Sequence, residues 1–259
     1  MNPSSQSELV SIDQLGSPPR VEKLWELMDI VWRLYGCSQW RFNSQKYKLF
    51  YSHSIWKLNE IFIEQDPESK LHREIFAQAI ATKNPKNILD YGGGSGYLAK
   101  LIATKTPGAF VDLYDPYMTA ANGQLINRIR NLKSNTYDLI LATDVLEHVH
   151  DPLKLMEEFS YLLVDGGWLL LANCFEPVIL CHLPQTFHLK FSLPIFAKAF
   201  GLKYEGCVDS THAIWLRKVR PKSPFWPLLR VQEKYHQFIY PVQLFWYKWG
   251  AAIKRCMPF

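Results

Sequence analysis

The sequence has little cysteine, and none of it at a spacing that binds zinc. The five cysteines are Cys37, Cys174, Cys181, Cys207 and Cys256, and no two of them form a CxxC pair. A scattered set of odd number provides neither a disulfide framework nor a zinc knuckle. We therefore expect a reduced intracellular protein, and we assign it to the cytoplasm.

Long apolar runs and a leader segment are also missing. No stretch of about 18 apolar residues occurs, so a conventional transmembrane helix is not predicted. The initial segment MNPSSQSELVSIDQLGSPPR is polar and lacks the apolar centre of a signal peptide. We expect residues 1–19 to be disordered.

Acidic residues are scarce at the C-terminal end. Residues 217–259 contain nine Lys or Arg residues against Glu233 alone, although the net charge of the whole chain is only +5. The rest of the chain is therefore slightly acidic, and the basic tail does not indicate that the main domain binds nucleic acid. With 48% hydrophobic and 20% charged residues, that domain can form a packed core.

Apolar periodicity divides the chain into a helical start, an alternating centre and a basic aromatic end. Helical spacing predicts helices over 21–35, 47–62 and 67–83. Further helices are expected at 96–105, 118–132, 151–164 and 192–201, and strands at 87–92, 108–115, 137–146, 166–174, 202–210 and 212–219. Near-continuous apolar strands between helices are typical of a parallel sheet covered on both faces.

We therefore predict an α/β fold with a Rossmann-like, mostly parallel seven-stranded sheet. An N-terminal helical lid is assigned to residues 20–84, the core to residues 85–219, and a C-terminal extension to residues 220–259.

Four glycines occupy five positions in ILDYGGGSGYLAK, residues 88–100. A glycine loop between a strand and a helix start exposes backbone N–H groups, and such loops bind nucleotides. The dinucleotide fingerprint G-x-G-x-x-G requires a glycine where this chain has Tyr97. An NAD- or FAD-binding enzyme is therefore the second interpretation of this loop.

The D-x-G-x-G-x-G pattern is followed, in order, by FVDLYDP, YDLILATDVLEHVHDP, LLVDGGWLLLANC and FHLKFSLPIFAKAFGLKYEG. This ordered set, over roughly residues 85–218, resembles the class I S-adenosylmethionine-dependent methyltransferases. Within that class it is similar to the small-molecule group that includes the ubiquinone-type O-methyltransferases. The resemblance implies S-adenosylmethionine as cofactor and, as the residues that bind it, Asp90, Gly92, Gly94, Gly96, Asp115 and Asp144.

The chemistry of the cofactor suits these positions. Bare glycine backbone leaves room for the methionine portion and the ribose, and Asp90 can contact the loop or the ammonium group. Asp115 offers two acceptor oxygens to the ribose hydroxyls, while a turn-starting role is its alternative. Asp144 ends a strand at the crevice and can equally be a cap. The segment 116–136 is short and contains no acidic residue that could contact adenine, and INRIRNLKSN, residues 126–135, can supply a shortened third strand in place of helix.

The resemblance implies methyl transfer to a small molecule, most simply to a hydroxyl oxygen. N- or C-methylation, an NAD-dependent oxidoreductase and a non-catalytic binding protein stay open. A hydroxyl acceptor needs a base, and histidine suits neutral pH. We take His148 as the first candidate and His188 as the second, with His182 a weaker third. A helix-capping role for His148 and surface roles for the other two are the alternatives.

A metal ion is not predicted. The stretch EHVHD holds four possible ligands, but residues so close in sequence rarely converge on one ion, and no distant partner is evident. On the lid, Tyr47 and Tyr51 are candidate pocket residues, with ordinary packing as the alternative.

We expect residues 220–259 to pack on their own domain or on the partner of a homodimer, and peripheral membrane contact is the second interpretation. Nucleic-acid binding is not expected. No clean single face is formed by Phe238, Pro241, Leu244, Phe245, Tyr247 and Trp249.

Overall fold

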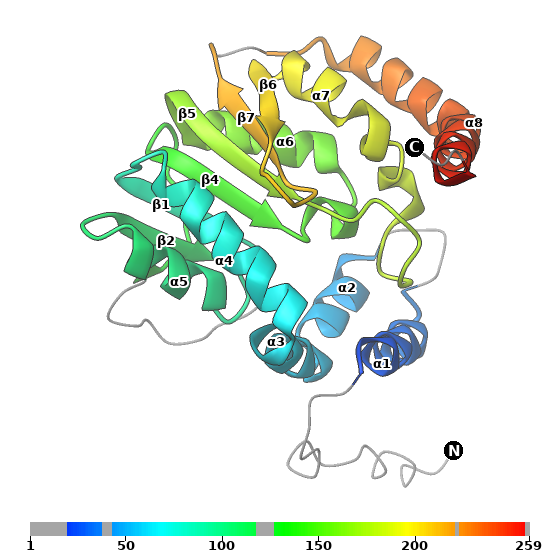
Figure 1. Ribbon diagram of the computed structural model, residues 1–259, viewed down its shortest axis with the longest axis horizontal. Helices are drawn as coiled ribbons and strands as arrows, with labels where there is room; N and C mark the ends of the chain where they lie inside the picture. The colour runs from blue at the N-terminus through cyan, green and yellow to red at the C-terminus, as the bar shows by residue number, and fades with distance from the viewer. Residues whose placement is uncertain (1–19, 38–42, 118–126, 221–222, 257–259) are drawn as a thin grey trace, which may run out of the picture.

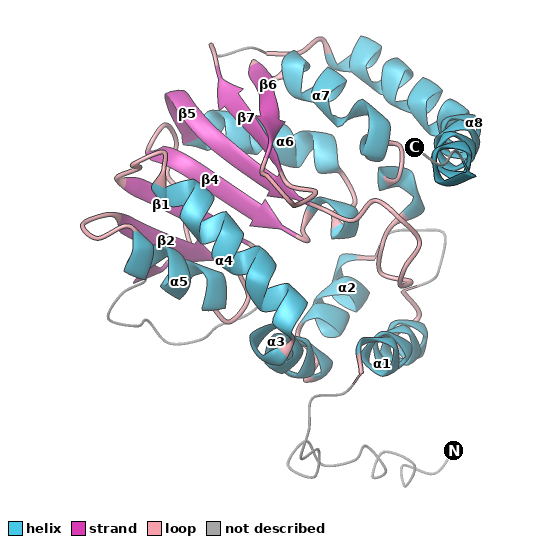
Figure 2. Ribbon diagram, in the orientation of Figure 1, coloured by secondary structure: helices cyan, strands magenta, loops and turns pink. Residues whose placement is uncertain are grey.

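A seven-stranded β-sheet forms the centre of the fold (Figures 1 and 2). The computed structural model describes residues 20–37, 43–117, 127–220 and 223–256, with 250–256 described by their backbone alone. Its strands are β1 (Asn87–Tyr91), β2 (Phe110–Tyr114), β3 (Asn127–Arg128), β4 (Tyr137–Thr143), β5 (Leu163–Ala172), β6 (Leu202–Cys207) and β7 (Ile214–Lys218). They lie in the order β3-β2-β1-β4-β5-β7-β6, and only β7 runs antiparallel to its neighbours. The predicted fold class is confirmed.

Helices cover both faces of the sheet. They are α1 (Val21–Leu34), α2 (Ser44–Tyr51), α3 (Ile55–Gln65), α4 (Pro67–Ala81), α5 (Tyr97–Lys105), α6 (Pro152–Leu162), α7 (Leu189–Ala199) and α8 (Trp226–Cys256). On one face, Ile80 of α4 and Ile102 of α5 are fully buried against the sheet. On the other face, Phe159 of α6 and Phe196 of α7 are fully buried. Because both faces are covered, the central strands are apolar throughout.

Two of the covering helices begin at an Asp-Pro pair. Asp66 accepts a hydrogen bond from the Ser69 backbone N–H at 2.7 Å, and Asp151 accepts one from Lys154 at 3.1 Å. The proline that follows each aspartate occupies the first helical position, where its missing N–H costs nothing. The starts of α4 and α6 are therefore fixed locally by the sequence.

The carboxyl ends of β1, β2 and β4 meet at one edge of the sheet. β1 lies between β2 and β4, so the chain leaves β1 on one side and later returns on the other. Ligands of open parallel sheets bind in the crevice at such a reversal. The glycine loop follows β1, Asp115 follows β2 and Asp144 follows β4, so this edge gathers the predicted cofactor-binding segments.

The lid is smaller than predicted. Helices α1, α2 and α3 form their own apolar cluster with Ile179, Cys181 and Leu183, whereas α4 packs on the sheet. The single helix expected over 47–62 is two helices, because the chain turns at residues 52–54, where the His53 ring accepts a hydrogen bond from the Ile55 N–H at 3.0 Å. The lid therefore comprises α1 to α3 rather than residues 20–84.

The third strand is short. The predicted helix 118–132 lies partly outside the described residues, and the predicted disordered segment 1–19 lies wholly outside them. Residues Asn127–Arg128 form β3, a strand parallel to β2, and the Asn127 amide donates a hydrogen bond to Asp112 at 2.9 Å. β3 lies within the segment 126–135 that was considered as a shortened third strand, and the helix expected over 118–132 does not continue through residue 127.

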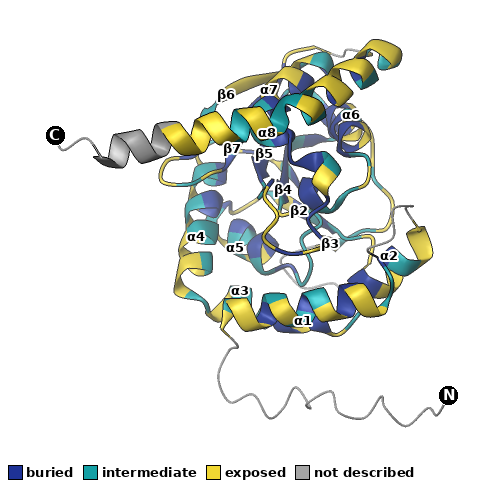
Figure 3. Ribbon diagram, turned by 90° about the vertical axis from the view of Figure 1, so that its right-hand side faces the viewer, coloured by how far each residue is buried: buried dark blue, intermediate teal, exposed yellow. Residues whose placement is uncertain are grey.

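The C-terminal helix α8 runs along the outside of α7 (Figures 1 and 3). The Tyr240 ring contacts Phe187 and Phe191, so α8 packs on its own domain, which is one of the two placements expected for the extension. Among the described residues, no helix is both long and apolar enough to cross a membrane.

Candidate functional site

A cavity of about 800 Å³ lies between the carboxyl edge of the sheet and the lid. Its floor includes the glycine loop, Asp115 and Asp144, and its opposite wall includes Tyr47 and Tyr51 of α2. The predicted cofactor-binding segments and the predicted lid tyrosines therefore border the same cavity.

The glycine loop has a backbone that side chains rarely allow. Gly92, Gly94 and Gly96 have φ angles of +73°, +53° and +86°. A side chain at Gly93 would collide with the Asp90 carboxylate and with Leu113. The loop thus needs glycine both for its conformation and for its close packing over β1.

Asp115 holds the glycine loop from the end of β2. Its carboxylate accepts hydrogen bonds from the backbone N–H groups of Gly94 at 3.1 Å and Tyr117 at 2.8 Å. On the other side, the Arg128 guanidinium donates a hydrogen bond to the Gly94 carbonyl at 2.6 Å. The short strand β3 therefore supplies a loop contact that the sequence did not indicate. The carboxylate of Asp115 also borders the cavity.

Asp90 is a fully buried carboxylate at the border of the cavity. Neither of its oxygens makes a well-formed hydrogen bond among the described residues, although the Ala99 backbone N–H is close enough to lower the pKa of the carboxyl. Burial raises the pKa of Asp90 to about 7, and Asp115 adds to this, while the charges of Arg73 and Arg128 oppose it. A buried carboxylate without well-formed hydrogen bonds is costly, so this group is suited to a cationic ligand.

Arg73 is a residue of the cavity that sequence reasoning missed. It lies on α4, its side chain is mostly buried, and its guanidinium is 3.7 Å from the Asp144 carboxylate. Asp144 itself follows β4 with a φ of +54°, and its side chain is largely exposed. Since Arg73 stands in an ordinary amphipathic helix, no local pattern distinguished it from a surface arginine.

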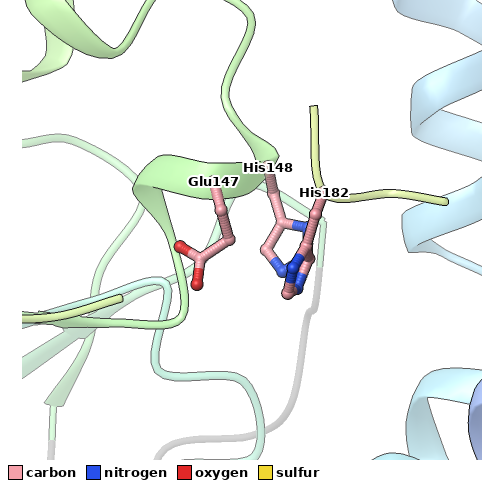
Figure 4. Close-up of side chains that lie close together, drawn as sticks. All are labelled: Glu147, His148 and His182. Carbon is pink, nitrogen blue, oxygen red and sulfur yellow. The ribbon is translucent and has the colours of Figure 1, made fainter. Parts of the chain in front are cut away.

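Two histidines that line the cavity meet a fully buried glutamate beside it (Figure 4). Glu147 and His148 lie on a short 3₁₀ helix after β4, and His182 lies on the loop between β5 and α7. Ligand atoms of these three residues all lie within 4.8 Å of one another. The distant partner that the sequence did not reveal is thus His182.

Both histidines are oriented by backbone carbonyls. The Nδ1 of His148 lies 3.1 Å from the Cys181 carbonyl oxygen, and that of His182 lies 2.8 Å from the Glu176 carbonyl oxygen. An N–H at Nδ1 leaves the Nε2 lone pair of each ring available. Burial lowers the pKa of His148, and burial together with His148 lowers that of His182. Both rings are therefore neutral near pH 7.

Glu147 is held as a buried acceptor. Its two oxygens accept hydrogen bonds, each of 2.6 Å, from the Asn173 amide and the Cys174 backbone N–H. Burial raises the pKa of Glu147, and the nearby Asp144 raises it further. With His148 and His182 it has the composition of a divalent metal site, although only the deprotonated carboxylate would bind an ion.

His188 lies away from the cavity. It precedes α7, is buried, and its Nδ1 lies 2.9 Å from the Ser192 hydroxyl. The ring packs edge-on to Phe196, and burial lowers its pKa to about 4. The loop position that suggested a catalytic role instead places His188 in the packing of α7.

Aromatic rings of the lid surround His148. Tyr51 and Trp56 contact its ring edge-on, with centroids 6.0 and 6.1 Å away. Tyr51 also stacks on Tyr117, with ring centroids 4.9 Å apart. Since the Tyr117 N–H donates to Asp115, this stack connects the lid to the end of β2. On α1, Asp29 accepts a hydrogen bond from the Leu180 N–H at 2.7 Å. The lid is therefore tied to both sides of the cavity.

Comparison with known proteins agrees with this geometry. A family model described as "Methyltransferase domain" matches residues 39–243. The ubiquinone biosynthesis O-methyltransferase of Nitrosomonas europaea is 24% identical over 193 residues, which cover 62% of this chain and 82% of that protein. Among solved structures, an O-methyltransferase family protein from Burkholderia thailandensis has a TM-score of 0.52 at 12% identity, over 78% of this chain and 71% of the other. A SAM-dependent methyltransferase from Aquifex aeolicus has a TM-score of 0.43 at 14% identity, over 69% and 100%.

Proposed function

Since the chain belongs to the methyltransferase domain family and is an S-adenosylmethionine-dependent methyltransferase, we propose that its acceptor is the hydroxyl group of a small aromatic molecule. Because the chain belongs to this family, the two alternative interpretations of the sequence, an NAD-dependent oxidoreductase and a non-catalytic binding protein, are set aside. The observation that carries the finer proposal is His148, a neutral base facing an aromatic-walled cavity.

The residues present fit S-adenosylmethionine. The buried carboxylate of Asp90 suits the ammonium group, and the mostly buried guanidinium of Arg73 suits the carboxylate of the same amino-acid end. Asp115 follows β2 and lines the cavity, and a carboxylate there suits the two ribose hydroxyls. When bound, the cofactor supplies an electrophilic methyl group on a sulfonium. The protein's part is to align the acceptor and to exclude water.

The Asp115 assignment is tested by Asp115→Ala. We expect the affinity for S-adenosylhomocysteine to fall by about tenfold or more, because charge-assisted hydrogen bonds to the ribose and the support of Gly94 are lost together. Isothermal titration calorimetry measures this. Asp138→Ala is a control, since Asp138 on β4 binds the backbone N–H groups of Lys86 and Asn87, at the end of the sheet away from the loop. Unchanged affinity in Asp115→Ala would remove Asp115 from the cofactor site.

On the acceptor side, His148 takes the proton of the hydroxyl. The Cys181 carbonyl fixes the ring so that Nε2 is the accepting atom, and burial keeps the ring neutral. A base of this kind typically contributes two to four orders of magnitude in rate. Transfer to a hydroxyl requires this proton to leave, whereas a neutral amine can attack before it loses a proton.

The lid favours a flat apolar acceptor. Tyr51 and Trp56 provide aromatic walls, and Tyr47 and Phe62 extend the apolar lining. The buried Tyr51 hydroxyl has no hydrogen-bond partner among the described residues, so it can bind a second oxygen of the acceptor. This pattern suits a phenol with a neighbouring oxygen substituent, and it agrees with the O-methyltransferase name of the Nitrosomonas relative.

The acceptor class is tested by methyl transfer from labelled S-adenosylmethionine to matched aromatic compounds. We expect catechols and simple phenols to be methylated, and the corresponding anilines and methoxy-blocked analogues to be inert. Tyr51→Phe should slow catechols more than simple phenols, because only catechols use the second oxygen. Preferred methylation of the anilines would overturn the hydroxyl assignment, while the cofactor assignment would still stand.

A further inference from the structure

Helix α8 exposes a continuous apolar stripe. The residues of this α8 stripe alternate at three- and four-residue intervals, and each side chain is between 54% and 82% exposed: Leu228, Val231, Tyr235, Phe238, Val242, Phe245 and Trp249. Such spacing places all of them on one side of the helix. Figure 3 shows α8 crossing the outside of the molecule, with exposed residues along the part whose burial is described.

The opposite side of α8 attaches the helix to the domain. Leu229 and Glu233 are buried, and the Tyr240 ring lies 6.2 Å from Phe187 and 5.9 Å from Phe191. The α8 stripe therefore contributes nothing to holding the helix on α7. Large apolar surface that folding does not use indicates a site of interaction.

Polar contacts also fix α8 next to the cavity. Arg230 pairs with Glu233 and with Asp151, which borders the cavity, and the Gln237 amide donates a hydrogen bond to the Gln185 carbonyl at 3.1 Å. The stripe is thus presented on a helix that is anchored to the acceptor side of the site.

Charge along α8 is almost entirely positive. Glu233 is the one acidic residue of the sequence 226–256, and it is buried beside Arg230. Lys234 and Lys248 are exposed and each directly precedes a stripe residue. Because two seven-residue repeats separate them, both lie along the same border of the stripe. The exposed sides of α8 therefore combine cations with aromatic and aliphatic residues and offer no exposed carboxylate.

The sequence pattern concealed this stripe because α8 is apolar on two sides. Leu244 is half-buried on the inner side, and the Tyr247 ring lies 5.7 Å from Phe191, although Tyr247 itself is 55% exposed and its neighbour Trp246 is 64% exposed. Phe238 and Phe245 belong to the outer side. When the two sets are combined, no single face emerges, although each set forms one.

We propose that the α8 stripe is a docking surface for an anionic lipid bilayer. An amphipathic helix with Trp and Phe on one side and Lys at the borders lies in the plane of the headgroups, where anionic lipid attracts the cations. Tyr and Trp favour this same boundary. In a dimer through α8, the Lys-flanked stripes would face each other without a carboxylate to compensate, so a second copy fits less well.

The proposal is tested by flotation of the full chain with vesicles. The protein should float with phosphatidylcholine vesicles containing roughly one third phosphatidylglycerol, and much less with phosphatidylcholine alone. The double variant Phe238→Glu, Phe245→Glu should float about tenfold less, because two large apolar side chains leave the interface. Lys234→Gln with Lys248→Gln should weaken only the binding to the anionic vesicles.

A matched control is Phe110→Glu, because Phe110 is 76% exposed but lies on β2, far from α8 (Figure 1). It should float like the unaltered protein, and all variants should keep their affinity for S-adenosylhomocysteine. Equal flotation of the double variant would overturn the proposal. The proposal would also be overturned if the unaltered protein did not float, formed a dimer by light scattering, and became monomeric in the double variant. These results leave the methyl acceptor undecided and so test α8 alone.

Discussion

Replacing Asp90 with asparagine is expected to stabilise the protein without ligand and to weaken S-adenosylhomocysteine binding by about a hundredfold. The carboxylate is fully buried and makes no well-formed hydrogen bond among the described residues, so its charge costs stability until a cation binds. Asparagine removes that charge at nearly the same volume. Thermal unfolding without ligand and calorimetry with S-adenosylhomocysteine measure the two effects.

The stabilisation should depend on pH. Burial raises the pKa of Asp90 from 3.8 to about 7, so between these values the folded protein keeps a proton that the unfolded chain has released. The free energy of unfolding therefore falls as pH rises through this window, by roughly 4 kcal/mol for this group. Because asparagine does not titrate, the advantage of the variant should be small near pH 4 and largest above pH 7.

Asp138→Asn is the matched control for this prediction. Asp138 on β4 accepts hydrogen bonds from the backbone N–H groups of Lys86 at 3.0 Å and Asn87 at 2.9 Å. The same chemical change should there destabilise the protein and leave the cofactor affinity unaltered. If Asp90→Asn also destabilised the protein and bound S-adenosylhomocysteine normally, Asp90 would be a structural residue and not a cofactor ligand.

The contrast between these aspartates illustrates what the sequence could and could not predict. The position of Asp90 before the glycine loop and that of Asp115 after the next strand are local features, because strand period and glycine spacing are visible over a few residues. The same holds for the apolar strand β4 and for the Asp-Pro starts of α4 and α6. Most of the sheet could be predicted for this reason.

The residues that were missed come from elements far away in the chain. Arg73 reaches the cavity because α4 packs on the sheet, and His182 reaches Glu147 because the loop after β5 folds back under the lid. Their approach depends on tertiary packing, which one sequence does not display. Conversely, His188 was predicted from its place in a motif, yet its ring is used in the packing of α7.

Replacing His148 with asparagine is expected to lower kcat by about a hundredfold to a thousandfold and to leave the cofactor affinity unchanged. The asparagine amide can still donate to the Cys181 carbonyl in place of Nδ1, so the loop is preserved while Nε2 is lost. Burial lowers the pKa of His148, and the neutral ring is the base. In the unaltered enzyme kcat should therefore decline as pH falls through this lowered pKa, and the variant should lack that decline.

His182→Asn separates a base from a metal ligand. His182 lies beside His148, with ring centroids 4.9 Å apart, and its Nδ1 bonds the Glu176 carbonyl in the same way. If His148 alone takes the proton, His182→Asn should cost less than about tenfold in kcat, and dialysis against EDTA should leave the rate unchanged. If the two variants lost rate equally, and EDTA removed an activity that a divalent cation restored, Glu147, His148 and His182 would together hold a metal ion. The acceptor proton would then be labile because the ion lowers the pKa of a hydroxyl bound to it.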